Sequence, residues 1–120
     1  MIRVLVTDDS RVMRQIVIRT LRQAGYDWDV REASDGAEAL AAIQADEPDV
    51  VLSDWNMPNM TGIELLRSLR AAGYQTPFGF VTSEGSPEMR STAQEAGALF
   101  LIAKPFTAEG FREVIDPVLA

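Results

Sequence analysis

Short apolar runs alternate with amphipathic stretches along this chain, and this alternation limits the fold more than any other feature of the sequence. In the amphipathic stretches, apolar residues recur at the spacing of one face of an α-helix. The run at 49–53 is apolar without alternation, as in a strand buried on both faces of a parallel sheet. Strands that alternate with helices predict an α/β fold with a doubly wound, five-stranded parallel sheet. We expect strands near 2–7, 28–33, 49–53, 77–82 and 99–103, and helices near 11–24, 36–45, 63–73, 87–96 and from 107 onward.

Local signals mark the ends of several expected helices. Ser86 is placed to cap the helix at 87–96 and Gly97 to end it, while Thr107 would cap the last helix. Pro117 falls where that last helix would continue, and an interior proline costs about 3 kcal/mol or more. Because the residue before a proline is biased away from helix, we expect the last helix to end or kink there. The alternative is that Pro117 sits in a frayed last turn at little cost.

The composition bounds both the size and the chemistry of the protein. A length of 120 residues predicts one domain, 1–120, with no output domain. The net charge of −7 argues against nucleic acid or an anionic membrane as the partner. Without Cys or His, a metal would be held by oxygen ligands, as Mg²⁺, Mn²⁺ or Ca²⁺ are. We also expect a cytoplasmic location, since no apolar stretch approaches the ~20 residues that span a bilayer and the N-terminus is unlike a signal peptide.

Chemically useful side chains stand at the ends of four of the expected strands. The carboxyl ends of parallel strands lie along one edge of a sheet, where ligands bind in α/β folds. Three carboxylates, a hydroxyl and an amine would therefore meet at this edge, which indicates a site for a metal and a phosphoryl group. These residues are Asp8 and Asp9 after the first strand, Asp54 after the third, Thr82 closing the fourth and Lys104 after the fifth.

Four short motifs in this order resemble the receiver domain of bacterial two-component response regulators, and most closely the single-domain, CheY-like chemotaxis regulators. Each motif is weak alone, but together, each after a strand, they are specific to that family. The resemblance implies a flavodoxin-like (βα)5 fold with strand order 2-1-3-4-5, which makes the first and third strands neighbours. The motifs are DDS at 8–10, SDWNMPNMTG at 53–62, VTS at 81–83 and KPF at 104–106.

The resemblance assigns a role to each residue of the expected phosphorylation site. Asp54 is the phosphoacceptor, which takes a phosphoryl group from a histidine kinase to give an aspartyl phosphate. Thr82 donates its hydroxyl to one phosphoryl oxygen, and Lys104 places a point charge on another. The simpler interpretations are a turn or cap residue for Asp54, a strand end for Thr82 and solvated surface for Lys104. In the family the bond between Lys104 and Pro105 is often cis.

The acidic pair is expected to hold Mg²⁺. Carboxylates this close raise one another's pKa, and a divalent cation would remove the repulsion between them. By resemblance, Asp9 binds the ion directly and Asp8 partly through water, with Asp54 and the backbone carbonyl of Asn56 completing the protein ligands. The simpler alternative is that Asp9 and Ser10 only cap the next helix.

Two further positions concern how the phosphoryl group is lost. Asn56 and Glu84 lie two residues beyond Asp54 and Thr82, where family members tune self-dephosphorylation. This pair is similar to that of fast-resetting chemotaxis regulators, so we predict a short-lived phosphoryl group. Trp55, beside the acceptor, is expected to report on the site by fluorescence, whereas Trp28 is expected to be a packing residue.

The output side departs from the family pattern at two places. The family uses the face formed by the helix at 87–96, the strand at 99–103 and the last helix to bind a downstream effector protein. An aromatic residue three positions before the lysine takes part in the switch, and here that position is Leu101. Phe100 is one residue away and would point to the opposite face of the sheet. With Pro117 in the last helix, these differences predict a changed output surface in which repacking of Leu101 transmits the signal.

Alternatives from other classes stay open at this point. One alternative is a relay that passes its phosphoryl group on, or a phosphate sink that holds it, without an effector of its own. A Mg²⁺-dependent phosphatase of the haloacid-dehalogenase type would want a second Asp two residues after the nucleophile, where this chain has Asn56. A flavodoxin-like nucleotide-binding module would have a Ser-, Thr- and Gly-rich first loop instead of Asp8 and Asp9. On the leading interpretation the protein is not an enzyme, because it has no separate substrate to turn over.

Overall fold

Five parallel strands and five helices alternate through residues 1–119, which are the residues that the computed structural model describes. The strands form a single sheet in the order β2-β1-β3-β4-β5, as the resemblance implied. The strands are β1 Arg3–Thr7, β2 Asp29–Ala33, β3 Val50–Ser53, β4 Phe78–Thr82 and β5 Phe100–Ala103. The helices are α1 Arg11–Gln23, α2 Gly36–Ala45, α3 Gly62–Ala71, α4 Pro87–Ala96 and α5 Ala108–Leu119.

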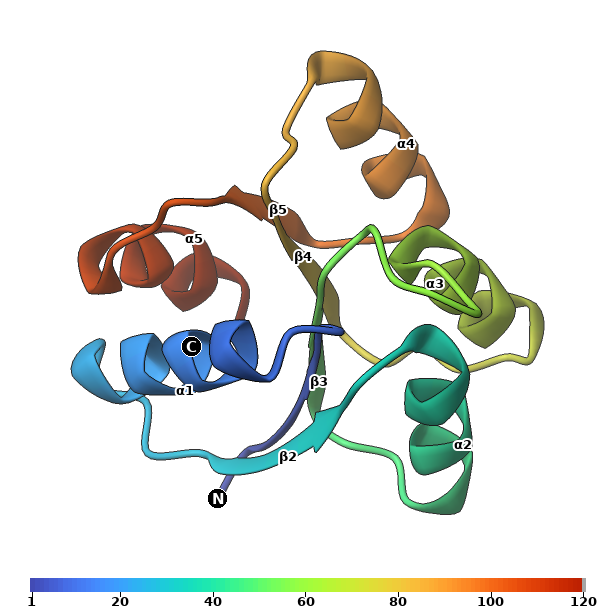
Figure 1. Ribbon diagram of the computed structural model, residues 1–120, viewed down its shortest axis with the longest axis horizontal. Helices are drawn as coiled ribbons and strands as arrows, with labels where there is room; N and C mark the ends of the chain where they lie inside the picture. Colours follow the sequence, from blue (N-terminus) through green and yellow to red (C-terminus); the bar gives the residue numbers. More distant parts are fainter. Residues whose placement is uncertain (120) are drawn as a thin grey trace.

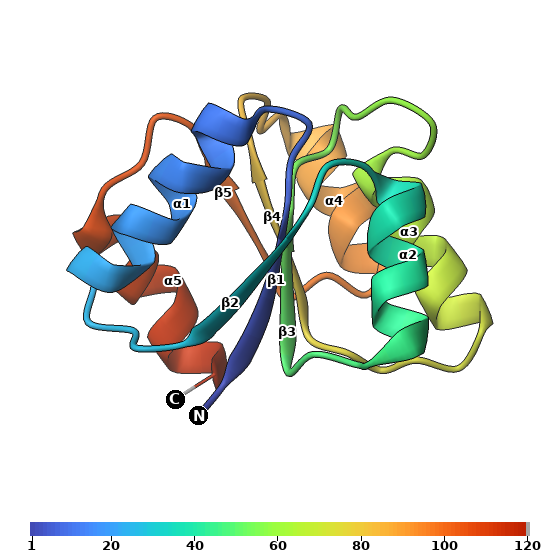
Figure 2. The same cartoon turned by 60° about the horizontal axis from the view of Figure 1, so that its bottom comes forward.

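The sheet is the middle of three layers. Helices α1 and α5 cover one face, and α2, α3 and α4 cover the other (Figures 1 and 2). Each face has its own buried apolar cluster, and the strands contribute alternate residues to the two clusters. Leu5, Phe78 and Phe80 face α2, α3 and α4, whereas Val4, Val6 and Val81 face α1 and α5. All five strands therefore lie between two helical layers, as expected of a parallel sheet.

Local capping explains where most helices begin. The Ser10 hydroxyl accepts from the Met13 amide at the start of α1, and the Ser86 hydroxyl accepts from the Met89 amide at the start of α4. The expected bounds of α2 and α4 are confirmed, and Gly97 ends α4 with φ at +106°. The Thr107 hydroxyl accepts from the Gly110 amide at the start of α5, so this expected cap is also confirmed.

The predicted end of the last helix at Asp116 is wrong, and the alternative position of Pro117 in the last turn agrees with the structure. Helix α5 continues through Pro117 to Leu119, which places the proline within its last turn. Proline lacks the N–H that would bond to the Glu113 carbonyl four residues earlier, and its ring crowds that carbonyl. Only Val118 and Leu119 of the helix follow Pro117, so the disturbance affects little of α5. Phe111 and Ile115 are both fully buried on the inward face of α5, and this packing holds the helix to the sheet.

Neighbouring side chains of strand β5 point to different layers. Leu101 is 7% exposed and belongs to the cluster under α3 and α4, whereas Phe100 packs against the cluster under α1 and α5. The expectation that Phe100 points to the opposite face of the sheet from Leu101 is therefore confirmed. Gly79 is paired with Phe100 across β4 and β5, and a Cβ atom on Gly79 would overlap the Phe100 ring. The ring occupies the space that this glycine leaves open.

No helix within residues 1–119 is long and apolar enough to cross a membrane.

Candidate functional site

The acidic residues of the site come from the ends of β1 and β3, the two central neighbours in the sheet. Thr7 and Ser53 are register partners, so the residues that follow them leave the sheet side by side. The Asp54 amide donates to the Thr7 carbonyl at 2.9 Å, and the Asp8 amide donates to the Ala33 carbonyl of β2 at 3.1 Å. Backbone hydrogen bonds of the sheet thus set the starting point of each acidic side chain.

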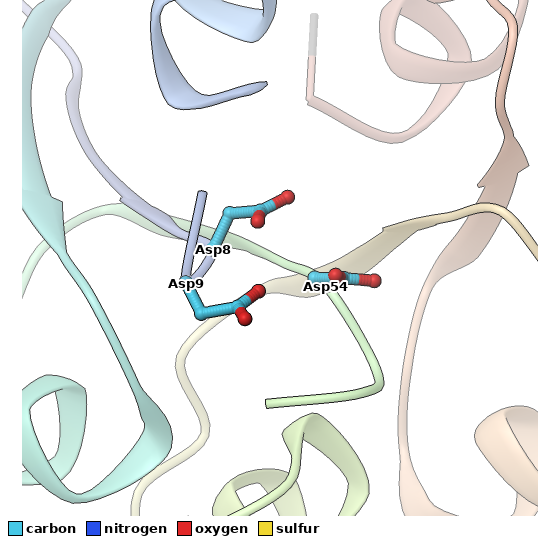
Figure 3. Close-up of side chains that lie close together, drawn as sticks. All are labelled: Asp8, Asp9 and Asp54. Atoms are coloured by element: carbon cyan, nitrogen blue, oxygen red, sulfur yellow. The ribbon is translucent and has the colours of Figure 1, made fainter. Parts of the chain in front are cut away.

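Three carboxylates meet at this edge. One carboxylate oxygen from each of Asp8, Asp9 and Asp54 lies within 4.8 Å of those of the other two (Figure 3). Their surroundings differ, since Asp8 is 3% exposed, Asp54 is half-buried and Asp9 is exposed. The sequence-based grouping of these three residues at one edge agrees with the structure.

One ammonium group lies beside two of these carboxylates. Lys104 Nζ is 3.1 Å from Asp8 Oδ2 and 3.7 Å from Asp54 Oδ2. Its position follows from the sheet, because its amide donates to the Thr82 carbonyl at 2.8 Å just beyond the end of β5. The Lys104–Pro105 bond is cis. With three carboxylates and one ammonium group, the site keeps an excess of negative charge.

This donor set fits a hard divalent cation. Carboxylate oxygens are the ligands that Mg²⁺ prefers, and the exposed Asp9 leaves one side of the site open to water. Both carboxylate oxygens of Asp8 already accept hydrogen bonds, Oδ1 from the Ser10 amide at 2.9 Å and Oδ2 from Lys104. The exposed Asp9 is therefore the carboxylate with the greatest freedom to bind an ion directly.

The environment of Asp54 opposes its ionised form. Burial raises the pKa of the Asp54 carboxyl above its usual value, and the neighbouring charge of Asp8 adds to this effect. The Lys104 ammonium acts in the other direction, as do the hydrogen bonds from the Trp55 amide and the Thr82 hydroxyl. The Trp55 amide donates to Asp54 Oδ1 at 2.7 Å, and the Trp55 ring lies 4.8 Å from that of Phe80.

The remaining predicted residues surround Asp54 on the side of β4. Thr82 is fully buried, and its Oγ1 accepts from the Glu84 amide at 3.4 Å. Asn56 and Glu84 are both exposed, and Asn56 Nδ2 donates to Glu84 Oε1 at 3.4 Å. The structure therefore brings together every residue predicted for the site except Leu101, which is buried between the sheet and α4.

Some contacts at this edge could not be found from the motifs. Arg14 donates from one guanidinium nitrogen to the Asp8 carbonyl at 2.7 Å and from Nε to Glu32 at 2.9 Å. Asn59 donates to Asp35, at the start of α2, at 2.8 Å. The only sequence signal for Asp35 is an acidic residue immediately before a helix, which predicts a cap and not a contact with a distant loop.

Comparison with known proteins agrees with this geometry. A model of the response regulator receiver domain family matches residues 4–116. The chemotaxis protein CheY1 of Helicobacter pylori is 39% identical over 98% of this chain and 96% of its own length. The chemotaxis protein CheY-3 of Vibrio cholerae is 38% identical over 97% of this chain and 90% of its own length. The solved structure of the chemotaxis response regulator CheY4 of Vibrio cholerae superimposes with a TM-score of 0.86 at 40% identity, covering 99% of each chain.

Proposed function

Because this chain belongs to the response regulator receiver domain family, we propose that it is a phosphorylation-controlled signalling switch of a two-component system, acting in chemotaxis. The observation that carries the proposal is the meeting of Asp8, Asp9 and Asp54 with Lys104 at the carboxyl ends of the strands. A phosphoacceptor needs a nucleophile, and the phosphoryl group it receives needs compensating positive charge.

Asp54 is the nucleophile in this proposal. A carboxylate oxygen of Asp54 attacks the phosphorus of a phosphohistidine on a sensor kinase, and the bond between phosphorus and the imidazole nitrogen breaks. The nitrogen keeps the electron pair and is then protonated, while Asp54 becomes an acyl phosphate. The half-buried position of Asp54 keeps its charge poorly solvated and so favours its reaction with an electrophile.

Lys104 and Thr82 would stabilise the transferred group. Lys104 is already within 3.7 Å of Asp54, so its ammonium can move from the carboxylate to a phosphoryl oxygen with little displacement. The Thr82 hydroxyl lies at the end of the adjacent strand β4 and would donate to a second phosphoryl oxygen. Thr82 ends strand β4 and Lys104 directly follows β5, so the sheet sets the position of both residues.

Asp8, Asp9, Asp54 and the Asn56 carbonyl would hold Mg²⁺. When bound, the ion would offset the charge of the carboxylates and of the incoming phosphoryl oxygens. We propose Asp9 and Asp54 as direct ligands, with Asp8 acting partly through water because its own oxygens accept from Ser10 and Lys104.

Self-dephosphorylation returns the switch to its resting state. The exposed pair of Asn56 and Glu84 lies at the open side of Asp54, where a water molecule would approach the phosphorus. Attack by this water breaks the bond to the Asp54 oxygen, releases inorganic phosphate and regenerates the carboxylate. No separate substrate is turned over, so the protein acts as a switch and not as an enzyme with its own substrate.

The signal would leave through protein binding on the face of α4, β5 and α5. Leu101 lies in the buried layer beneath α4, so its repacking would couple events at Thr82 to that face. The acidic net charge disfavours nucleic acid and membranes as partners and accords with a cytoplasmic signalling protein. A phosphorelay shuttle or a phosphate sink is the second candidate, since both would use the same acceptor chemistry.

Titration of the purified protein with Mg²⁺ and then beryllofluoride or acetyl phosphate, followed by Trp55 fluorescence, tests the proposal. We expect a saturable response that is lost in Asp54→Asn and kept in Asp27→Asn, a matched change at an exposed aspartate away from the site. Acetyl phosphate should add one alkali-labile phosphoryl group to the wild type and to Asp27→Asn, and none to Asp54→Asn. A folded wild-type protein without these responses, or one that hydrolyses p-nitrophenyl phosphate with many turnovers, would contradict the proposal.

A further inference from the structure

The loop between β3 and α3, residues 54–61, is fastened to the first turn of α2. Asn59 Nδ2 donates to Asp35 Oδ2 at 2.8 Å, and the Gly36 amide donates to the Met60 carbonyl at 3.1 Å. The two bonds join residues that are 24 positions apart in the sequence, one through side chains and one through the backbone. The loop that begins at the acceptor Asp54 is therefore held at its far end by a helix that contributes no ligand to the acidic cluster.

The packing at this junction leaves no room for a side chain on Gly36. Gly36 is buried, and a Cβ atom on it would overlap the Met60 carbonyl oxygen and lie 2.8 Å from the Met60 Cβ. Asn59 has φ at +67°, the one positive φ among the non-glycine residues in 1–119. Asparagine tolerates this left-handed conformation better than most residues, and such outliers cluster at functional sites. The loop is thus held in a demanding conformation by direct contact with α2.

The near end of the same loop contains the groups that act at the site. The Trp55 amide donates to Asp54 Oδ1, and the Asn56 side chain donates to Glu84 across the open side. The Trp55 carbonyl accepts from the Gly62 amide at 2.8 Å, which closes the loop back on itself. Asn56 is three residues before Asn59, so the hydrogen bond from Asn59 to Asp35 limits the positions that the Asn56 backbone can adopt.

Each oxygen of Asp35 has a different partner. Oδ1 accepts from the Glu38 amide at 2.8 Å and caps α2, while Oδ2 accepts from Asn59. The carboxylate therefore fixes the start of a helix and the position of a loop at the same time. A neutral cap such as serine would serve the helix equally well, so helix capping alone does not account for an aspartate at this position.

We propose that Asp35 and Asn59 are positioning residues for the metal site, holding the 54–61 loop so that the Asn56 carbonyl and the Asp54 carboxylate are already placed to receive Mg²⁺. The inference rests on the proposed function of the acidic cluster. A backbone carbonyl has no side-chain rotation of its own, so its position is set by the conformation of the loop that carries it. Ordering that loop before the ion arrives removes an entropic cost from binding.

Two variants remove the hydrogen bond between Asp35 and Asn59, one keeping the backbone conformation of residue 59 and the other keeping the cap of α2. Asn59→Gly accepts the positive φ but cannot donate to Asp35. Asp35→Ser keeps a cap for α2 but is too short to reach Asn59. We expect each variant to weaken Mg²⁺ binding, measured by Trp55 fluorescence, roughly three- to ten-fold, the factor that corresponds to one hydrogen bond of ordinary strength. Because both remove the same bond, the double variant should be no weaker than either single one.

Two controls distinguish positioning from a general effect on α2. Ser34→Ala removes a side-chain hydrogen bond of 2.6 Å to Glu38 at the same helix end, outside the loop, and should leave Mg²⁺ affinity unchanged. Asp35→Asn keeps a capping oxygen, and its new amide can donate to the Asn59 oxygen after that side chain turns over, so near-wild-type affinity should return. Amide hydrogen exchange should quicken at 56–60 in Asn59→Gly and Asp35→Ser and stay unchanged in both controls.

The wild type is titrated first, which separates this inference from the function on which it rests. A wild type that does not respond to Mg²⁺ would overturn both. A wild type that binds Mg²⁺, together with Asn59→Gly within 1.5-fold (roughly, the reproducibility of such titrations) of it, would overturn the positioning role alone. If Asp35→Ser does not fold, Asn59→Gly still decides the matter, because Asn59 is exposed and glycine suits its backbone.

Discussion

Lys104 is the residue on which the electrostatic balance of the site depends. Its side chain is 16% exposed, and it is shared between Asp8, which is almost fully buried, and the half-buried Asp54. Burial and Asp8 both raise the pKa of Asp54, and the lysine is the nearby full charge that opposes them. A cation that enters the site must therefore compete with this ammonium group, while a phosphoryl group would recruit it.

Removal of this ammonium should make Mg²⁺ binding tighter and folding weaker. We expect Lys104→Met to lower the free energy of unfolding without Mg²⁺ by about 2–4 kcal/mol, since it leaves buried carboxylates unpaired. The Mg²⁺ dissociation constant should fall by roughly ten-fold, because the competing positive charge is gone. Urea unfolding and fluorescence titration measure the two effects.

Arg67→Met is the matched control, because it removes one positive charge from an exposed position on α3. It should leave both quantities close to their wild-type values. A Lys104→Met protein that binds Mg²⁺ more weakly than the wild type would show that the ammonium organises the carboxylates instead of competing for them.

For helices and strands, local sequence signals were sufficient to predict the bounds of an element, except where tertiary packing sets its end. The bounds of α2 and α4 could be predicted because the residues that cap and end these helices are adjacent to them in the sequence. The end of α5 could not, because Pro117 is a local signal that the buried contacts of Phe111 and Ile115 outweigh. The faces of Phe100 and Leu101 followed from the two-residue period of a strand, which β5 keeps in regular register with β4.

Helix α5 is also tied to the segment before β2. The Tyr26 hydroxyl donates to the Asp116 carboxylate, and the Tyr26 ring lies 4.7 Å from that of Trp28. Burial, together with the hydrogen bond and the charge of Asp116, raises the pKa of Tyr26 to about 12, while Arg112 acts slightly in the other direction. This contact joins α5 to the α1–β2 connection immediately before Pro117.

The raised pKa of Tyr26 predicts a loss of stability at alkaline pH. Below pH 10 the tyrosine is protonated in both the folded and the unfolded chain, so its contribution is complete. Between about pH 10 and 12 the unfolded chain loses this proton and the folded one keeps it, so the free energy of unfolding falls as pH rises. Urea unfolding at pH 9 and pH 11 should show a smaller decrease for Tyr26→Phe than for the wild type. Equal decreases in the two proteins would place the alkaline loss elsewhere.

For the molecule as a whole, the site is the place where segments distant in sequence meet. Asp8 and Lys104 are 96 residues apart, and the sheet order brings them within 3.1 Å. The motifs allowed these residues to be grouped, because each follows a strand of a known type of sheet. The bond between Asp35 and Asn59 could not be predicted, since it depends on how the first turn of α2 meets a loop outside the sheet.

An ion bound where β1 and β3 end should stabilise the entire fold. We expect Mg²⁺ at ten times its dissociation constant to raise the free energy of unfolding by about 1.4 kcal/mol, because the unfolded chain does not assemble the site. Asp9→Asn should abolish most of this gain at little cost to the metal-free protein, since Asp9 is exposed. Thermal unfolding with and without Mg²⁺ measures both. An equal gain in Asp9→Asn would mean that the ion binds without this carboxylate.

The shared space of Gly79 and Phe100 has a consequence for how sequences of this fold diverge. The two residues share one volume between neighbouring strands. A larger side chain at one position therefore requires a smaller one at the other. A relative with a leucine or valine at the first position should therefore carry glycine or alanine at the second, and intermediates with two large or two small residues should be rare. Covariation between β4 and β5 is thus expected at a pair that lies outside the acidic cluster.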